Sequence, residues 1–139
     1  MRVLSVTAQK PCSTGSGVYL TEVVRSLAKM GVSQAVVAGV TREDRVDMPE
    51  GVTVYPVYFS SEKLPYPVVG MSDEMPYTST RYRDMTEEMA GQFKAAFLEV
   101  LDEAIEKENP DIIIVVVWPG QYRSEAFLCD PTVALEKIR

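Results

Sequence analysis

The first forty residues decide the fold, and they read MRVLSVTAQKPCSTGSGVYLTEVVRSLAKMGVSQAVVAGV (residues 1–40). An apolar run over residues 3–8 predicts a β-strand, and the turn-forming residues 10–17 predict a loop after it. Over residues 18–31 the apolar positions recur every three or four residues, which predicts an amphipathic helix that a glycine ends. A second apolar strand is predicted over residues 35–40. This order predicts a right-handed βαβ unit within a parallel sheet.

The remainder of the chain continues to alternate strands and helices. A third strand is predicted over residues 52–57, where apolar residues alternate weakly. The longest helix is predicted to start near Asp84, with Glu87 as its capping-box partner, and to stop at residues 109–110, Asn-Pro. Residues 111–118 form a continuous β-branched run, which predicts a core strand buried on both faces of the sheet.

Two segments do not follow this alternation. Residues 58–83 hold three prolines and five aromatic residues without a helical period, so we predict a long ordered loop that packs on the domain. Asp130 and Pro131 have the residue types of a helix start, which predicts a short final helix over residues 133–138. The whole pattern predicts a single α/β domain over residues 1–139, with a Rossmann-like parallel sheet and helices on both faces.

Composition narrows the function classes. With 139 residues, 46% hydrophobic and 24% charged, the chain is neither a disordered tail nor a membrane-spanning bundle. Its net charge of -6 argues against nucleic acid and anionic membranes as partners. The absence of histidine excludes Ser/His and Cys/His nucleophiles. Two distant cysteines and no long apolar stretch predict a cytoplasmic protein without a zinc site, a disulfide or an integral membrane segment.

The most informative local motif is Gly15-Ser16-Gly17, between the first strand and the first helix. Backbone N–H groups at a helix start carry partial positive charge, and glycine lets a phosphate approach the main chain closely. The motif lacks the third glycine of a dinucleotide fingerprint and the Lys-Ser/Thr of a P-loop. It therefore predicts either a phosphate site or an ordinary tight turn.

Other residues allow a functional and a structural interpretation. Cys12 is either a reactive thiol near a helix start or a structural residue. Trp118 either stacks on a sugar or base or packs at the rim of the sheet. Four methionines either bind a soft metal or fill the core and loops. They are Met71, Met75, Met85 and Met89. We expect no metal site here and assign no catalytic residue.

Three segments resemble the N-terminal domain of family 4 glycosyltransferases, which have the GT-B fold. They are the loop PCSTGSGVY over residues 11–19, the helix end LAKMG over residues 27–31, and NPDIII over residues 109–114. The family has a proline- and glycine-rich loop after its first strand, a similar helix end, and a P-D-I-I-like strand after a long helix. The resemblance covers residues 1 to about 118.

The resemblance implies the acceptor-side half of a two-domain retaining enzyme that moves a sugar from a nucleotide-sugar to an acceptor. It implies no cofactor and no metal, because the nucleotide-sugar is a co-substrate. The donor phosphates would face Gly15, Ser16 and Gly17. The acceptor would contact Tyr77, Thr80 and Arg81.

The chain departs from the family in ways that lead to a second hypothesis. The donor-binding domain expected after Arg139 is missing from the sequence, and so are the family's histidines. We therefore expect this chain alone to be inactive in sugar transfer. The alternative is a non-enzymatic module in which the strand from Ile112 leaves an unpaired apolar edge and forms a homodimer or larger assembly. A small flavodoxin-like nucleotide-binding enzyme is a third possibility, but the sequence has no recognisable base or ribose partner for it.

Overall fold

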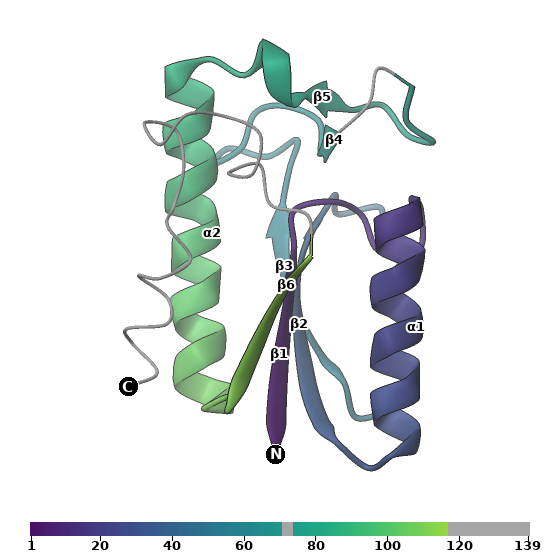
Figure 1. The fold of residues 1–139 in the computed structure, drawn as a ribbon. Helices are drawn as coiled ribbons and strands as arrows, with labels where there is room; N and C mark the ends of the chain where they lie inside the picture. Colours follow the sequence, from purple (N-terminus) through teal and green to yellow (C-terminus); the bar gives the residue numbers. More distant parts are fainter. Residues whose placement is uncertain (71–73, 117–139) are drawn as a thin grey trace.

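A four-stranded parallel sheet forms the centre of the computed structural model, which describes residues 1–70 and 74–116 (Figure 1). The strand order is β3-β2-β1-β6, and each neighbouring pair is parallel. The strands of this sheet are β1 (Arg2–Thr7), β2 (Ser33–Val40), β3 (Thr53–Tyr58) and β6 (Ile112–Val116). The other elements are α1 (Gly15–Lys29), β4 (Val69–Gly70), β5 (Thr80–Arg81), the 3-10 helix η1 (Tyr82–Asp84) and α2 (Glu87–Glu108).

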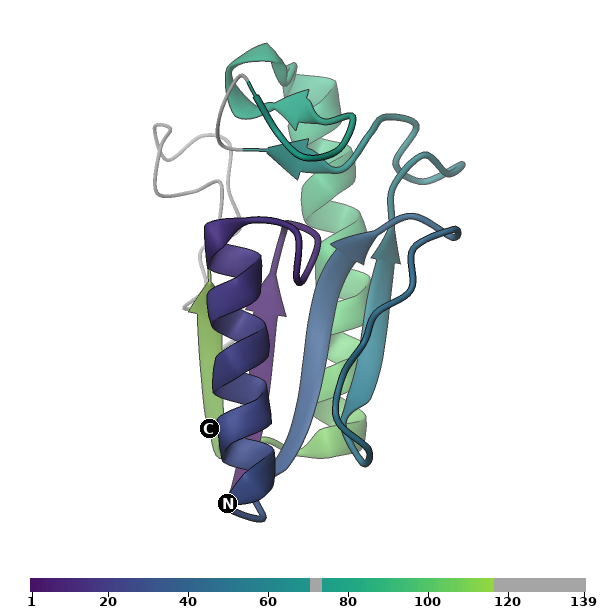
Figure 2. The same cartoon turned by 90° about the vertical axis from the view of Figure 1, so that its right-hand side faces the viewer.

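The two long helices cover opposite faces of the sheet (Figures 1 and 2). On one face, Leu20 and Val24 of α1 pack with alternate residues of β2 in a buried cluster. On the other face, Phe93 and Phe97 of α2 stack with ring centres 4.4 Å apart and join the larger core. Because β2 is apolar at nearly every position, it is buried from both sides, as expected of a central parallel strand. The predicted α/β fold with helices on both faces is confirmed.

Both helices begin at other residues than the sequence pattern predicted. The α1 helix starts at Gly15 and not at Val18, because the Thr14 hydroxyl accepts a hydrogen bond from the Gly17 N–H and caps the helix there. The α2 helix starts at Glu87 and not near Asp84, because Thr86 is its N-cap. Glu87 is therefore the first helical residue and no capping-box partner. Asn109 ends α2 in the left-handed conformation, where the end was predicted.

Residues 58–83 contain more regular structure than the predicted loop. The short strands β4 and β5 pair in parallel, with Val69 opposite Thr80. The η1 helix follows directly after β5. In Figures 1 and 2 this segment lies over the ends at which the central strands finish. The short strands β4 and β5 were missed because two-residue strands are too short to show a periodic sequence pattern.

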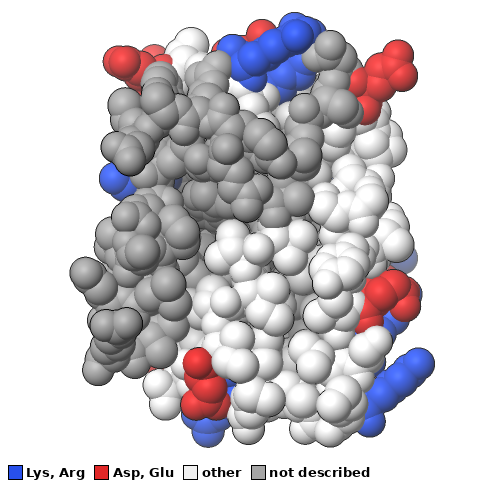
Figure 3. Space-filling view, in the orientation of Figure 1, with Lys and Arg blue, Asp and Glu red and all other residues white. Residues whose placement is uncertain are grey.

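The β6 strand is less buried than predicted. It pairs with β1 and forms the edge of the described sheet, where Ile113 and Val116 still pack against the buried clusters on the two faces. By contrast, Ile112 is 43% exposed and Val115 is 38% exposed. The described surface over β6 carries few charged side chains in the view of Figure 3, where most charged side chains lie around the outline of the molecule. The predicted final helix over residues 133–138, Met71, Trp118 and Cys129 lie outside the described residues.

Candidate functional site

The candidate site lies at the carboxyl ends of the strands, beside β1. The strand order reverses at β1, because β2 and β3 follow on one side of it, whereas the later strand β6 pairs with it on the other side. In open α/β sheets, ligands bind outside the carboxyl ends of the strands at such a reversal of strand order. The loop between β1 and α1 leaves the sheet at this point and leads into the glycine motif.

The three residues of the motif form the first turn of α1 and have different surroundings. The N–H of Gly17 donates to the Thr14 hydroxyl at 3.1 Å. Gly17 is buried, and a Cβ there would lie 2.6 Å from the Lys10 carbonyl oxygen, so glycine allows the preceding loop to pack on the helix. Gly15 is exposed, and a Cβ added there would have no neighbouring atom within 4 Å. Within the described residues, the N–H groups of Gly15 and Ser16 have no acceptor.

Gln9 connects this helix start to the segment above the sheet. Its side chain is buried, with an exposed fraction of 1%. The Oε1 atom of Gln9 accepts hydrogen bonds from the hydroxyls of Thr14 and Ser16, both at 3.3 Å. Its Nε2 atom donates to the Tyr82 hydroxyl at 3.4 Å. The Ser16 hydroxyl is therefore directed into the protein, so the backbone N–H is the group that Ser16 offers to a ligand.

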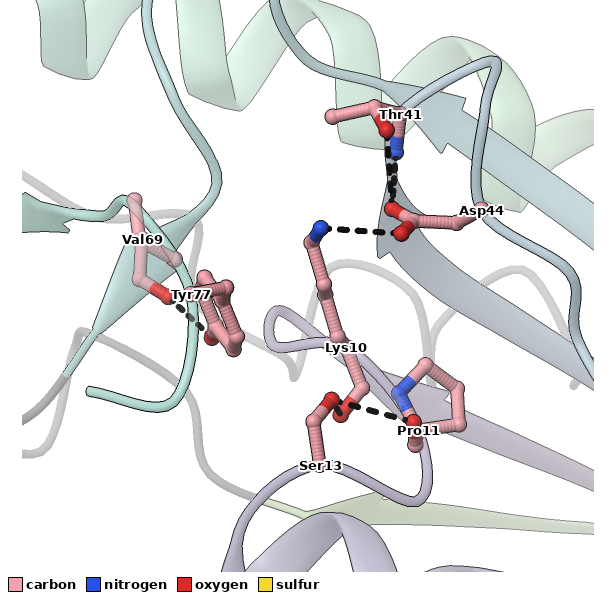
Figure 4. A network of polar contacts seen from close by, with 7 residues as sticks. All are labelled: Lys10, Pro11, Ser13, Thr41, Asp44, Val69 and Tyr77. Atoms are coloured by element: carbon pink, nitrogen blue, oxygen red, sulfur yellow. Dashed lines mark hydrogen bonds and ion pairs between the residues drawn. The ribbon is translucent and has the colours of Figure 1, made fainter.

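Lys10 joins three loops at the same end of the sheet through an ion pair with Asp44 and a cation–π contact with Tyr77 (Figure 4). The Lys10 ammonium lies 2.9 Å from Asp44 Oδ1 and 4.9 Å from the centre of the Tyr77 ring. The backbone N–H and the hydroxyl of Thr41 donate to Asp44 Oδ2 at 2.7 and 2.9 Å. Burial acts to raise the pKa of Asp44, but the hydrogen bonds from Thr41 and Lys10 outweigh it and hold this pKa below its usual value.

The three predicted acceptor contacts have different partners in the structure. Tyr77 lies beside Lys10, and its hydroxyl donates to the Val69 carbonyl at 2.9 Å; burial raises the pKa of this phenol. Thr80 is buried, and its hydroxyl donates to the Pro67 carbonyl at 2.6 Å. Arg81 Nε donates to Asp84 at 2.6 Å. The structure thus brings Tyr77 to the loop after β1, while these bonds of Thr80 and Arg81 stabilise their own segment.

The structure also shows the surroundings of Cys12 and of the methionines for which the sequence left two interpretations open. Cys12 is exposed in the left-handed conformation, with its sulfur 3.0 Å from the Thr21 hydroxyl. Met85 is buried in the core and Met89 packs against it, as the structural interpretation predicted. Among residues 1–70 and 74–116, no three His, Cys, Asp or Glu side chains are grouped closely enough to hold a metal ion.

Sequence reasoning missed Gln9, Lys10 and Asp44. Gln9 and Tyr82 are 73 residues apart, and Lys10 and Asp44 are 34 residues apart, so no local spacing indicates either contact. Such pairs become visible only when the chain has folded. Together the helix start and the loops around it can bind and orient an anionic group.

No protein-family model matches this chain, and neither does any curated protein. The resemblance to family 4 glycosyltransferases therefore rests on the three sequence segments quoted above. In the described part of the chain, neither helix has the length and apolar character needed to cross a membrane.

Proposed function

We propose that this domain binds the phosphate groups of a nucleotide-sugar at the start of α1 and forms the acceptor side of a retaining glycosyltransferase. The observation that supports the proposal most is the open pair of N–H groups on Gly15 and Ser16, at the carboxyl end of β1. A helix start of this kind attracts phosphate through its N–H groups and its dipole, without a metal ion.

Sugar transfer needs more than this one surface. The departing nucleoside diphosphate is stabilised by hydrogen-bond donors and charges placed around it, and the reactants must be held in line. The described residues would supply the donors on one side, so we expect ligand binding but no sugar transfer by this domain alone. Tyr77, Thr80 and Arg81 are the proposed acceptor residues; because Thr80 is buried and its hydroxyl donates to the Pro67 carbonyl, its part is to hold the segment that presents Tyr77 and Arg81.

Two substitutions of Gly15 test the phosphate site. Gly15→Pro removes the N–H at the first helical position, where proline is favoured. Thr14 has φ -132° and ψ 170°, the extended conformation that a residue before proline adopts, so the helix start is retained. Gly15→Ala is the matched control, because it keeps the N–H and its Cβ enters open space.

The measurement is a titration of the backbone amide signals with UDP-, GDP- and ADP-sugars. We expect signals of residues 15–17 to shift, with equal affinity for the wild type and Gly15→Ala. Gly15→Pro should bind about ten- to a hundredfold more weakly, since a hydrogen bond to a charged group contributes about 1.5–3 kcal/mol. Signals that do not move at millimolar ligand, or equal affinity for all three proteins, would contradict the proposal.

A second candidate function, a self-associating module, is favoured by the exposure of β6. The strand consists of five β-branched apolar residues without a charge, and it forms the edge of the described sheet. An edge of this kind offers unpaired backbone groups to another strand. The test is light scattering of the wild type and Val115→Lys, which places a charge on a side chain that is 38% exposed. A dimer or larger assembly that dissociates in the variant supports this function, and a monomeric wild type at high concentration refutes it.

A further inference from the structure

A separate hollow lies on the other side of the sheet, between the edge strand β3 and α2. Its volume is about 280 Å³, and we call it the Arg42 groove after the cation at its rim. This volume is slightly below the usual range of drug-sized ligand cavities, so its occupant is a small molecule. None of the residues discussed for the phosphate site lines it.

The floor of the Arg42 groove is apolar. Pro56 of β3 and the side chains of Ala96 and Val100 of α2 form part of its lining. Pro56 has no backbone N–H, so it removes one donor from the edge strand and disfavours the addition of another β-strand. The floor therefore favours the apolar body of a small ligand over an extended peptide.

Four charged residues line the groove, Arg42, Glu62, Lys63 and Glu99, and the guanidinium of Arg42 has no carboxylate partner among the described residues. Arg42 Cζ lies 4.5 Å from the centre of the Tyr58 ring, which orients the planar group. By contrast, the Lys63 ammonium at the same rim is bound by both oxygens of Glu99, at 2.7 and 2.8 Å. Arg42 thus offers the forked donors that bind a carboxylate in a bidentate manner.

Hydrogen bonds hold both loops at the rim in place. The loop of Arg42 is closed by Asp44, which accepts two bonds from Thr41 and pairs with Lys10. The loop after β3 is held by the Ser61 hydroxyl, which donates to the Tyr58 carbonyl at 2.7 Å. A site whose loops are ordered before binding loses little conformational entropy when the ligand arrives.

We propose that the Arg42 groove binds a small organic carboxylate. The carboxylate accepts hydrogen bonds from the Arg42 guanidinium, and the apolar body of the ligand lies on Pro56, Ala96 and Val100. The proposed ligand contacts differ from those of the proposed nucleotide-sugar site, although the ion pair of Lys10 with Asp44 holds loops at both places.

The test is an amide-signal titration with benzoate and with benzamide, its neutral analogue of the same shape. We expect benzoate to shift signals of Arg42, Tyr58 and residues 96–100 in a saturable way, and benzamide to bind much more weakly. Arg42→Gln should weaken benzoate binding about tenfold or more, because a charge-assisted hydrogen bond is lost. Arg45→Gln is the matched control, since it removes the same charge from the same loop at a position outside the groove.

The outcomes separate the proposal from nonspecific attraction of anions. Equal weakening by both arginine substitutions, or equal binding of benzoate and benzamide, overturns the role of Arg42. Shifts confined to residues 15–17 overturn the groove as the binding site, and an absence of saturable shifts overturns the proposal altogether. Arg42 is exposed, so the variant should fold, and its amide spectrum in the absence of ligand verifies this directly.

Discussion

Replacement of Gly17 by alanine tests why glycine stands at this position of α1. The sequence motif suggests that glycine admits a phosphate, whereas the structure places the Lys10 carbonyl oxygen 2.6 Å and the Cys12 nitrogen 3.1 Å from a Cβ at Gly17. Both atoms belong to the backbone, so a methyl group can enter only if the loop moves away from the helix. The same substitution at Gly15, two residues earlier, meets nothing within 4 Å.

The two alanine variants together isolate the cost of this clash. Helix propensity and the lower entropy of the unfolded chain favour alanine over glycine by up to about 1 kcal/mol at either position. Inserting a methyl group into a filled site costs about 1–3 kcal/mol. We therefore expect the free energy of unfolding of Gly17→Ala to lie about 1–3 kcal/mol below that of Gly15→Ala. For a domain of this length, this difference corresponds to about 4–12 °C in the melting temperature.

Urea unfolding followed by circular dichroism at helical wavelengths measures both free energies. The reasoning is refuted if Gly17→Ala is as stable as Gly15→Ala, because the loop would then give way at no cost. If Gly17→Ala keeps its stability but loses nucleotide-sugar binding, the glycine serves the approach of the ligand and not the packing of the loop.

Three further predictions follow from single contacts. The Tyr55 hydroxyl donates to Glu108 at 2.6 Å, and burial together with this carboxylate raises the pKa of Tyr55 to about 12. The contribution of this protonated phenol to stability is therefore complete below about pH 10 and is lost as the pH rises toward 12. The free energy of unfolding of Tyr55→Phe, measured in urea, should lack this pH dependence. Thr86→Ala removes the cap that accepts the Met89 N–H and should lower the free energy of unfolding by about 1 kcal/mol, whereas Thr86→Ser should retain it in the same assay. Because the pKa of Asp44 is lowered in the folded protein, its ionised carboxylate stabilises the fold fully above the usual pKa of a carboxyl group, and this stabilisation is lost as the pH falls through the lowered pKa. Acid unfolding curves of Asp44→Asn should therefore show a weaker pH dependence.

The sequence alone determined the kind and order of the main elements. The apolar runs of β1, β2 and β6 and the spacing of apolar residues in α1 and α2 are local patterns, and burial on a helix or strand imposes them directly. The βαβ order then implied a parallel sheet with helices on both faces, as the structure has it. The sequence also singled out Gly15, Ser16 and Gly17 as a phosphate site or a tight turn, but it placed them in the loop before the helix, whereas the structure has them in the first turn of α1.

Only the tertiary structure decided where the helices start, which strand residues are exposed and which distant loops meet. Thr14 and Thr86 determine where the two helices start, because each hydroxyl accepts a hydrogen bond from a backbone N–H of the first helical turn. The position of β6 at the edge of the described sheet, and not its composition, leaves Ile112 and Val115 exposed. Contacts such as Lys10 with Asp44 join segments far apart in the chain, and no spacing of neighbours encodes them. Periodicity is a property of local backbone geometry, whereas a binding site depends on which distant loops the folded sheet brings together.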